Sequence, residues 1–158
     1  MTTVTDLETV PAPTQRLAWS RVVPDVLQAM LALDKAASAG LDPALVHLVK
    51  THASMINGCA YCIDSHATDA RKLGETEHRL YALPAWRETP FFTARERAAL
   101  ALTEAITLLT EGHVPDAVYE EAARRFDEEE LGRLISLIAT INTWNRFGVT
   151  TRMSPAAR

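Results

Sequence analysis

Apolar residues recur along the chain at the three- and four-residue spacing that is typical of amphipathic helices. Nowhere do they alternate with polar residues over a long stretch, as they would in half-buried strands. Residues that cap or end helices divide this pattern into seven predicted segments. The predicted segments cover residues 24–39, 43–57, 59–73, 76–83, 98–109 with a cap just before it, 115–126, and a last helix that begins at residue 127.

Local signals mark several boundaries of these segments. Asp42 stands where an N-cap is expected, directly before a proline that suits the first turn of a helix. Thr93 and Asp127 are each followed three residues later by a glutamate, which is the pattern of a capping box. Gly58 and Gly74 stand where the C-terminus of a helix favours glycine. The boundaries therefore follow from residue chemistry as well as from periodicity.

Three of the segments carry an apolar face that we expect to be buried. The expected core residues are Val26, Leu27, Met30, Leu31 and Leu33 in the first, Leu45, Val46, Leu48, Val49, Ala53 and Ile56 in the second, and Leu131, Leu134, Ile135, Leu137, Ile138 and Ile141 in the last. The pattern predicts an all-α fold, a compact bundle of about six or seven helices. We expect residues 17–152 to form a single domain, with a flexible arm over 1–16 and a flexible tail over 153–158.

Composition and charge exclude several classes of function. The chain has 158 residues, of which 47% are hydrophobic and 23% charged, so it has enough apolar material for a folded core. Its net charge of -4, without a basic patch, excludes nucleic acid as the expected main partner. No apolar run is long enough to cross a membrane, and residues 1–8 lack the features of a signal peptide. We therefore expect a cytoplasmic protein that acts on neither nucleic acid nor membrane.

The most informative feature is a short stripe of thiol and imidazole groups. Cys59 and Cys62 are three residues apart, and His66 follows Cys62 by four. On a helix, both spacings place side chains on one face. Since Gly58 is expected to end the preceding helix, both thiols are expected in the first turn of the next one. A helix N-terminus and a nearby imidazole both favour the thiolate form of cysteine.

A thiolate in this position can attack the O–O bond of a peroxide and become a sulfenic acid. A second thiol within one turn can then condense with it to form a disulfide, which an external reductant returns to the dithiol. We assign Cys62, which is closer to His66 along the helix, as the attacking thiolate and Cys59 as the resolving thiol. The reverse assignment stays open, because Cys59 is nearer the helix terminus.

Other interpretations compete with this one. The cysteines could be structural core residues, because cysteine packs like a small hydrophobe. A zinc site could use Cys59, Cys62 and His66, but it would need a fourth ligand from elsewhere in the chain. Covalent haem attachment is excluded because Ile63, not histidine, follows Cys62. A thioredoxin-like fold would need strands around the motif, and none is predicted. We expect no bound cofactor or metal.

The sequence resembles the alkylhydroperoxidase D-like group of the carboxymuconolactone decarboxylase superfamily over about residues 20–150. Four stretches carry this resemblance, and together they are more specific than an isolated CxxC motif. They are Ala53-Ser54-x-Ile56-Asn57-Gly58-Cys59-Ala60-Tyr61-Cys62-x-Asp64-x-His66, the Arg95–Leu100 segment, His113-Val114-Pro115, and Ile141-Asn142-x-Trp144-Asn145-Arg146. The resemblance implies an all-helical fold that forms trimers or hexamers, and thiol-dependent reduction of hydroperoxides.

The resemblance also implies a proton relay, from which this chain departs at two positions. In the family, a glutamate twelve residues before the first cysteine works with the motif histidine, whereas here that position is His47. An imidazole can relay protons, but it supplies no fixed negative charge. Tyr61 replaces the histidine that lies between the cysteines in the best-known peroxidases. The departures predict either weaker peroxidase activity or a different substrate.

The leading hypothesis is therefore a thiol-dependent alkyl hydroperoxide reductase that takes an organic hydroperoxide or another small molecule. The resemblance suggests a dithiol or a lipoyl-type group as its reductant. One alternative is a cofactor-free decarboxylase that acts on a small acidic lactone and needs no thiols. Another is a non-enzymatic oligomer that senses redox state through the disulfide.

Overall fold

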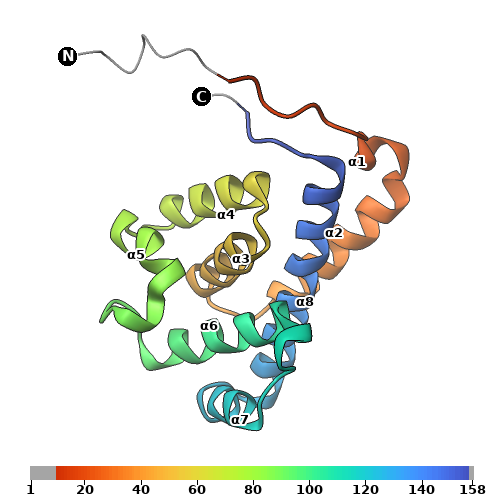
Figure 1. Ribbon diagram of the computed structural model, residues 1–158. Coiled ribbons are helices and arrows are strands. Elements are labelled where there is room, and N and C mark those ends of the chain that lie inside the picture. The colour runs from red at the N-terminus through yellow and green to blue at the C-terminus, as the bar shows by residue number, and fades with distance from the viewer. Residues whose placement is uncertain (1–9, 157–158) are drawn as a thin grey trace, which may run out of the picture.

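The computed structural model describes residues 10–156, and all regular structure in that range is helical (Figure 1). The α-helices are α1 (Trp19–Val22), α2 (Pro24–Ser38), α3 (Pro43–Asn57), α4 (Ala60–Lys72), α5 (Glu77–Ala82), α6 (Ala94–Thr107), α7 (Asp116–Arg125) and α8 (Glu128–Thr151). Two 3₁₀ helices complete the set, η2 (Leu83–Glu88) and η3 (Leu109–Glu111). The predicted all-α fold is confirmed. The expected number of helices was too low, because the described residues form eight α-helices.

Helix α3 lies at the centre of the fold and packs against α4, α6 and α8 (Figure 1). Its buried residues occupy nearly every side of the helix between Leu45 and Ser54. The predicted core residues of this helix are buried, apart from Ile56, which is half-buried. Those of α8 are buried as well, apart from the half-buried Ile135. The end of α3 is therefore held rigidly where the cysteine motif begins.

The caps that the sequence predicted are confirmed. The Asp42 carboxylate accepts hydrogen bonds from the backbone N–H groups of Ala44 and Leu45 at the start of α3. Thr93 and Asp127 each form a complete capping box, at α6 and α8 respectively. Each cap satisfies N–H groups that have no partner within the helix.

The apolar face predicted for α2 is only partly correct. Met30 is buried and Leu27 is half-buried, whereas Val26, Leu31 and Leu33 are exposed. The predicted set was wrong because it covers a wider arc of the helix than α8 can bury. The positions that face the protein instead continue from Met30 to Asp34 and Ala37.

Two short elements were not predicted. Helix α1 has only four residues and contains no buried residue, so it lacks the periodicity on which sequence prediction depends. Pro84 was expected to stop the helix that precedes it, but the chain continues as the 3₁₀ helix η2. Proline is tolerated there because it lies in the first turn, where its missing N–H has no helical partner to lose.

The segments before α1 and after α8 run side by side (Figure 1). The backbone N–H of Arg16 donates a 2.8 Å hydrogen bond to the carbonyl oxygen of Thr151, which joins them. The flexible arm and tail stay predictions, and residues 1–9 and 157–158 lie outside the described range. Oligomerisation likewise stays a prediction. Within residues 10–156, no helix combines the length and apolar character that crossing a membrane requires.

Candidate redox site

The cysteine motif begins at the turn between α3 and α4. Gly58 adopts the left-handed conformation, with φ of 67°, which ends α3 without the strain that a side chain would bring. Cys59 is the N-cap of α4, and its N–H donates to the carbonyl oxygen of Ser54 at 3.0 Å. The backbone N–H of Cys62 points at Cys59 Sγ across 3.4 Å. The first turn of α4 is thus organised around the sulfur of Cys59.

In the structure, Cys59 and Cys62 are joined as a disulfide, with their Cα atoms 5.3 Å apart. Both residues are buried, at 2% and 5% exposure. The predicted juxtaposition of the two sulfurs is therefore present. In this oxidised form neither residue offers a thiolate to a metal, and no group of three metal-ligating side chains occurs among residues 10–156.

Helix α8 crosses directly over the disulfide. A Cβ atom added at Gly148 would lie 2.7 Å from Cys59 Sγ and 3.4 Å from Cys62 Sγ. The first distance is shorter than carbon and sulfur tolerate, so only glycine lets the helix approach this closely. Sequence analysis missed Gly148, because nothing local marks a helix-interior glycine as part of a site.

Side-chain amides hold α8 in this place. Asn57, the last residue of α3, donates from Nδ2 to the Oδ1 atoms of Asn142 and Asn145, each at 2.9 Å. Asn145 in turn donates to the hydroxyl of Ser54 at 2.9 Å. Asn145 and Ser54 are almost completely buried, so these bonds are shielded from water. Two stretches of the family resemblance thus meet beside the disulfide.

His66 lies on α4 below the disulfide, and His47 on α3 lies next to it, with ring centroids 5.9 Å apart. The pKa of His66 is lowered to about 4, chiefly by burial and also by the charges of Lys50 and His47, against the opposing effect of Asp34 and Asp69. Burial also lowers the pKa of His47. Both imidazoles are therefore neutral at pH 7 and can accept a proton.

An ion pair between a buried lysine and a half-buried aspartate adjoins the two histidines. Lys50, only 5% exposed, lies on α3 with its Nζ 2.8 Å from Oδ2 of Asp34 on α2. Oδ1 of Asp34 and Nδ1 of both His47 and His66 are buried without a hydrogen-bond partner among the described residues. Sequence analysis missed this pair, because Asp34 falls within a helix whose facing was misjudged. The structure thus places a carboxylate near the histidines, although His47 stands where the family has glutamate.

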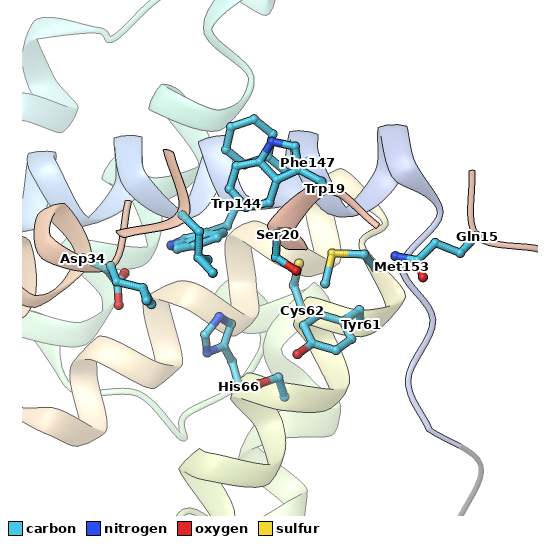
Figure 2. Close-up of a pocket in the computed structure, with 13 residues that line it drawn as sticks. Gln15, Trp19, Ser20, Asp34, Tyr61, Cys62, His66, Trp144, Phe147 and Met153 are labelled. Atoms are coloured by element: carbon cyan, nitrogen blue, oxygen red, sulfur yellow. The ribbon is translucent and has the colours of Figure 1, made fainter. Parts of the chain in front are cut away.

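A cavity of about 440 Å³ opens onto Cys62 and His66, and we call it the Cys62 cavity. Figure 2 shows the sulfur of Cys62 and the imidazole of His66 facing the space beneath Trp19 and Trp144. Trp19 stacks on Phe147 with ring centroids 4.1 Å apart. The lining is mostly apolar, and its polar side chains are spread over it, with Asp34 and Gln15 on opposite sides (Figure 2). The remaining lining residues are Gln15, Ser20, Leu27, Leu31, Asp34, Tyr61, Ser65 and Met153.

The structure brings most of the predicted site residues together. Cys62, His66 and Tyr61 line the Cys62 cavity, and Cys59 is bonded to Cys62. His47 does not line this cavity but lies beside His66 behind it. The polar side chains of the cavity can hold or move a proton, and its apolar lining can hold a hydrocarbon or aromatic group.

Known proteins share this sequence and fold. Residues 24–105 match the carboxymuconolactone decarboxylase family. The uncharacterized protein YdfG of Bacillus subtilis is 40% identical over 136 residues, which cover 85% of this chain and 92% of YdfG. Among solved structures, a protein of unknown function from Agrobacterium tumefaciens, ATU0492, suggested to be the antioxidant defence protein AhpD, is 36% identical with a TM-score of 0.87. The match covers 91% of this chain and 100% of ATU0492.

The debrominase Bmp8 shares the fold at greater distance. Its TM-score is 0.76 at 24% identity, and the match covers 87% of this chain and 74% of Bmp8. The fold is therefore shared by proteins with different chemistry, and activity must be argued from the side chains of each site.

Proposed function

The chain is an AhpD-like member of the carboxymuconolactone decarboxylase family, and from this premise we propose that it is a thiol-dependent reductase of organic hydroperoxides. The observation that carries the proposal is that one cysteine of a disulfide-bonded pair and a neutral, half-buried histidine line the same largely apolar cavity. A cavity of this kind suits a hydroperoxide whose carbon skeleton is apolar.

The first half of the cycle oxidises Cys62. In the reduced protein, neutral His66 takes the proton of the Cys62 thiol, and the thiolate attacks the terminal oxygen of the hydroperoxide. The O–O bond breaks, Cys62 becomes a sulfenic acid, and the alkoxide that leaves takes the proton back from the His66 imidazolium. The carboxylate of Asp34 favours the imidazolium electrostatically, whereas the charge of Lys50 opposes it more strongly.

The second half forms the disulfide. Cys59, as a thiolate, attacks the sulfur of the Cys62 sulfenic acid, the S–O bond breaks, and the hydroxide that leaves becomes water by taking up the proton that the Cys59 thiol gave up. The backbone N–H of Cys62 already points at Cys59 Sγ, so the helix terminus stabilises the attacking thiolate. The sum of both halves is dithiol plus hydroperoxide giving disulfide, alcohol and water. A dithiol or lipoyl-type reductant then restores the two thiols.

This proposal fits the site better than cofactor-free decarboxylation. Cys62 of the disulfide lines the cavity, where a decarboxylase would have no use for paired sulfurs. A variant with both cysteines changed to serine separates the two, because decarboxylation would survive that change and hydroperoxide reduction would not.

The proposal is tested by adding one equivalent of cumene hydroperoxide to fully reduced protein and measuring intact mass and free thiols. We expect rapid loss of both thiols, a mass lower by two hydrogen atoms, and recovery with dithiothreitol. The Cys59→Ser variant should accumulate a sulfenic acid on Cys62 that dimedone traps. Thiols that persist while peroxide remains in solution would overturn the proposal.

The His66→Gln variant tests the proton transfer, with His78→Gln as its matched control. His78 is exposed on α5, outside the Cys62 cavity. We expect the oxidation rate to fall by about 10²-fold or more for His66→Gln, the usual contribution of a general acid–base group, and to stay unchanged for His78→Gln. Equal rates in both variants would exclude His66 from the reaction.

A further inference from the structure

A second cavity, of about 220 Å³, lies at the other end of the disulfide, and we call it the Cys59 cavity. It is bounded by Cys59 and Ala60 at the start of α4, by Gly148 and Val149 of α8, and by Arg152. The Cys62 cavity is lined by Cys62 but not by Cys59, and the Cys59 cavity is lined by Cys59 but not by Cys62. Each cysteine therefore borders a cavity of its own.

Separate cavities beside the two cysteines suit the geometry of disulfide reduction. A thiolate attacks one sulfur along the axis of the S–S bond, and the other sulfur leaves at the opposite end. A thiol that enters the Cys59 cavity reaches Cys59 with Cys62 on the far side of the bond. The arrangement thus suits attack at Cys59 with Cys62 as the leaving sulfur.

We propose that the Cys59 cavity is the binding site of the dithiol reductant, separate from the Cys62 cavity in which the hydroperoxide reacts. This inference rests on the proposed function. A thiolate of the reductant attacks Cys59 Sγ, the Cys59–Cys62 bond breaks, and its electron pair stays on Cys62 as a thiolate. The second thiol of the reductant then attacks the reductant's sulfur in the mixed disulfide, which releases Cys59 as a thiolate and leaves the reductant as a disulfide.

Gly148 supplies independent support for this route. A Cβ at this position would lie 2.7 Å from Cys59 Sγ, on the side where Gly148 lines the Cys59 cavity. Because glycine stands there, the sulfur is reached from the cavity without an intervening side chain. The guanidinium of Arg152, which is exposed at the same cavity, favours the thiolate form of an incoming thiol.

Separate cavities would also link the reduction of the disulfide to the next oxidation by hydroperoxide. Attack at Cys59 frees the Cys62 thiolate into the Cys62 cavity, beside His66, where the next hydroperoxide reacts. Met153 borders both cavities and lies between the two spaces. Hydroperoxide and reductant therefore do not compete for the same volume.

The test measures the two half-reactions separately in variants that fill one cavity each. Val149→Trp fills the Cys59 cavity and Leu31→Trp the Cys62 cavity, and both positions are about half exposed, at 48%. Thr150→Trp is the matched control, because Thr150 is exposed next to Val149 and lines neither cavity. Reduction by dithiothreitol starts from protein oxidised with diamide, and oxidation by cumene hydroperoxide starts from reduced protein, each followed by acid quench and thiol alkylation.

We expect Val149→Trp to slow reduction by about tenfold or more and to leave oxidation within about twofold of the parent rate. Leu31→Trp should show the reverse pattern, and Thr150→Trp should change neither rate. The proposal is overturned if Val149→Trp is reduced at the parent rate, or if Leu31→Trp slows reduction as much as Val149→Trp does. If hydroperoxide fails to oxidise the parent protein, the proposed function falls, while the diamide-based measurements still decide between the two routes for the reductant.

Discussion

Replacing Gly148 with alanine is expected to make the Cys59–Cys62 disulfide easier to reduce. The new Cβ would lie 2.7 Å from Cys59 Sγ, so the sulfur has to move by several tenths of an ångström to reach ordinary contact. In the disulfide that sulfur is held by its bond to Cys62. In the dithiol it can turn about its χ1 torsion and relieve the contact. The substitution therefore penalises the oxidised form more than the reduced form.

The expected size of this effect follows from packing costs. Inserting one methyl group into a filled site costs about 1–3 kcal/mol. For a two-electron couple, about 30 mV corresponds to about 1.4 kcal/mol. If the whole cost falls on the oxidised form, the reduction potential rises by about 20–65 mV.

The assay is equilibration of the protein in dithiol–disulfide buffers of graded potential, followed by alkylation and mass measurement of the reduced fraction. Gly132→Ala is the matched control, because Gly132 lies on the same helix, α8, and a Cβ there meets nothing within 4 Å. We expect this control to leave the potential unchanged and to stabilise the protein by about 0.5–1 kcal/mol, as alanine does in helix interiors.

A midpoint potential for Gly148→Ala that equals the parent value, or lies below it, would refute this reasoning. Urea unfolding of the reduced variants provides the check on folding. If the reduced Gly148→Ala protein loses as much stability as the oxidised one, the clash does not depend on the disulfide.

Three further predictions concern stability. Burial lowers the pKa of His52 to about 4, against 6.5 in the unfolded chain. Because only the unfolded chain binds the proton between these two pH values, the free energy of unfolding should fall as the pH drops below 6.5, by about 2 kcal/mol at pH 5. Urea unfolding of His52→Gln should lack this share of the loss and keep the share that His66 contributes over the same pH range, and an identical loss in both proteins would contradict the assignment. Asp34→Asn leaves Lys50 buried and unpaired, so it should lower the free energy of unfolding in urea by about 3 kcal/mol. The double variant Asp34→Asn/Lys50→Met should regain much of this free energy, and additive effects of the two substitutions would contradict the coupling. Thr93→Ala should lower the unfolding free energy by about 1 kcal/mol without changing the oxidation rate; unaltered thermal unfolding would show that the capping box contributes nothing.

The features that sequence predicted correctly are those with local causes. Asp42, Thr93 and Asp127 cap helices through hydrogen bonds to residues two or three positions away, so their effect does not depend on the rest of the fold. The same holds for Cys62 and His66, whose four-residue spacing on α4 brings both side chains to one cavity. In these cases the sequence contains both partners of each interaction within one turn or two.

The features it missed depend on contacts between helices. The apolar residues of α2 suggested one wide face, but only the arc with Met30 and Ala37 is covered by the rest of the protein. The same rotation turns Asp34 inward to pair with Lys50 on α3. Because the facing of α2 is set by the helices it packs against, periodicity alone could not predict that a carboxylate would stand near the two histidines.

The different surroundings of the two cysteines show this limit most clearly. Spacing alone left the attacking sulfur undecided, because Cys62 is nearer to His66 and Cys59 is nearer to the helix terminus. What distinguishes them is α8, which crosses the disulfide at Gly148 and leaves one cavity at each sulfur. The hydrogen bonds from Asn57 to Asn142 and Asn145 hold that crossing in place. The two cysteines have the same side chain, and the packing of α8 gives them different surroundings. The roles that we propose for the two sulfurs depend on that packing.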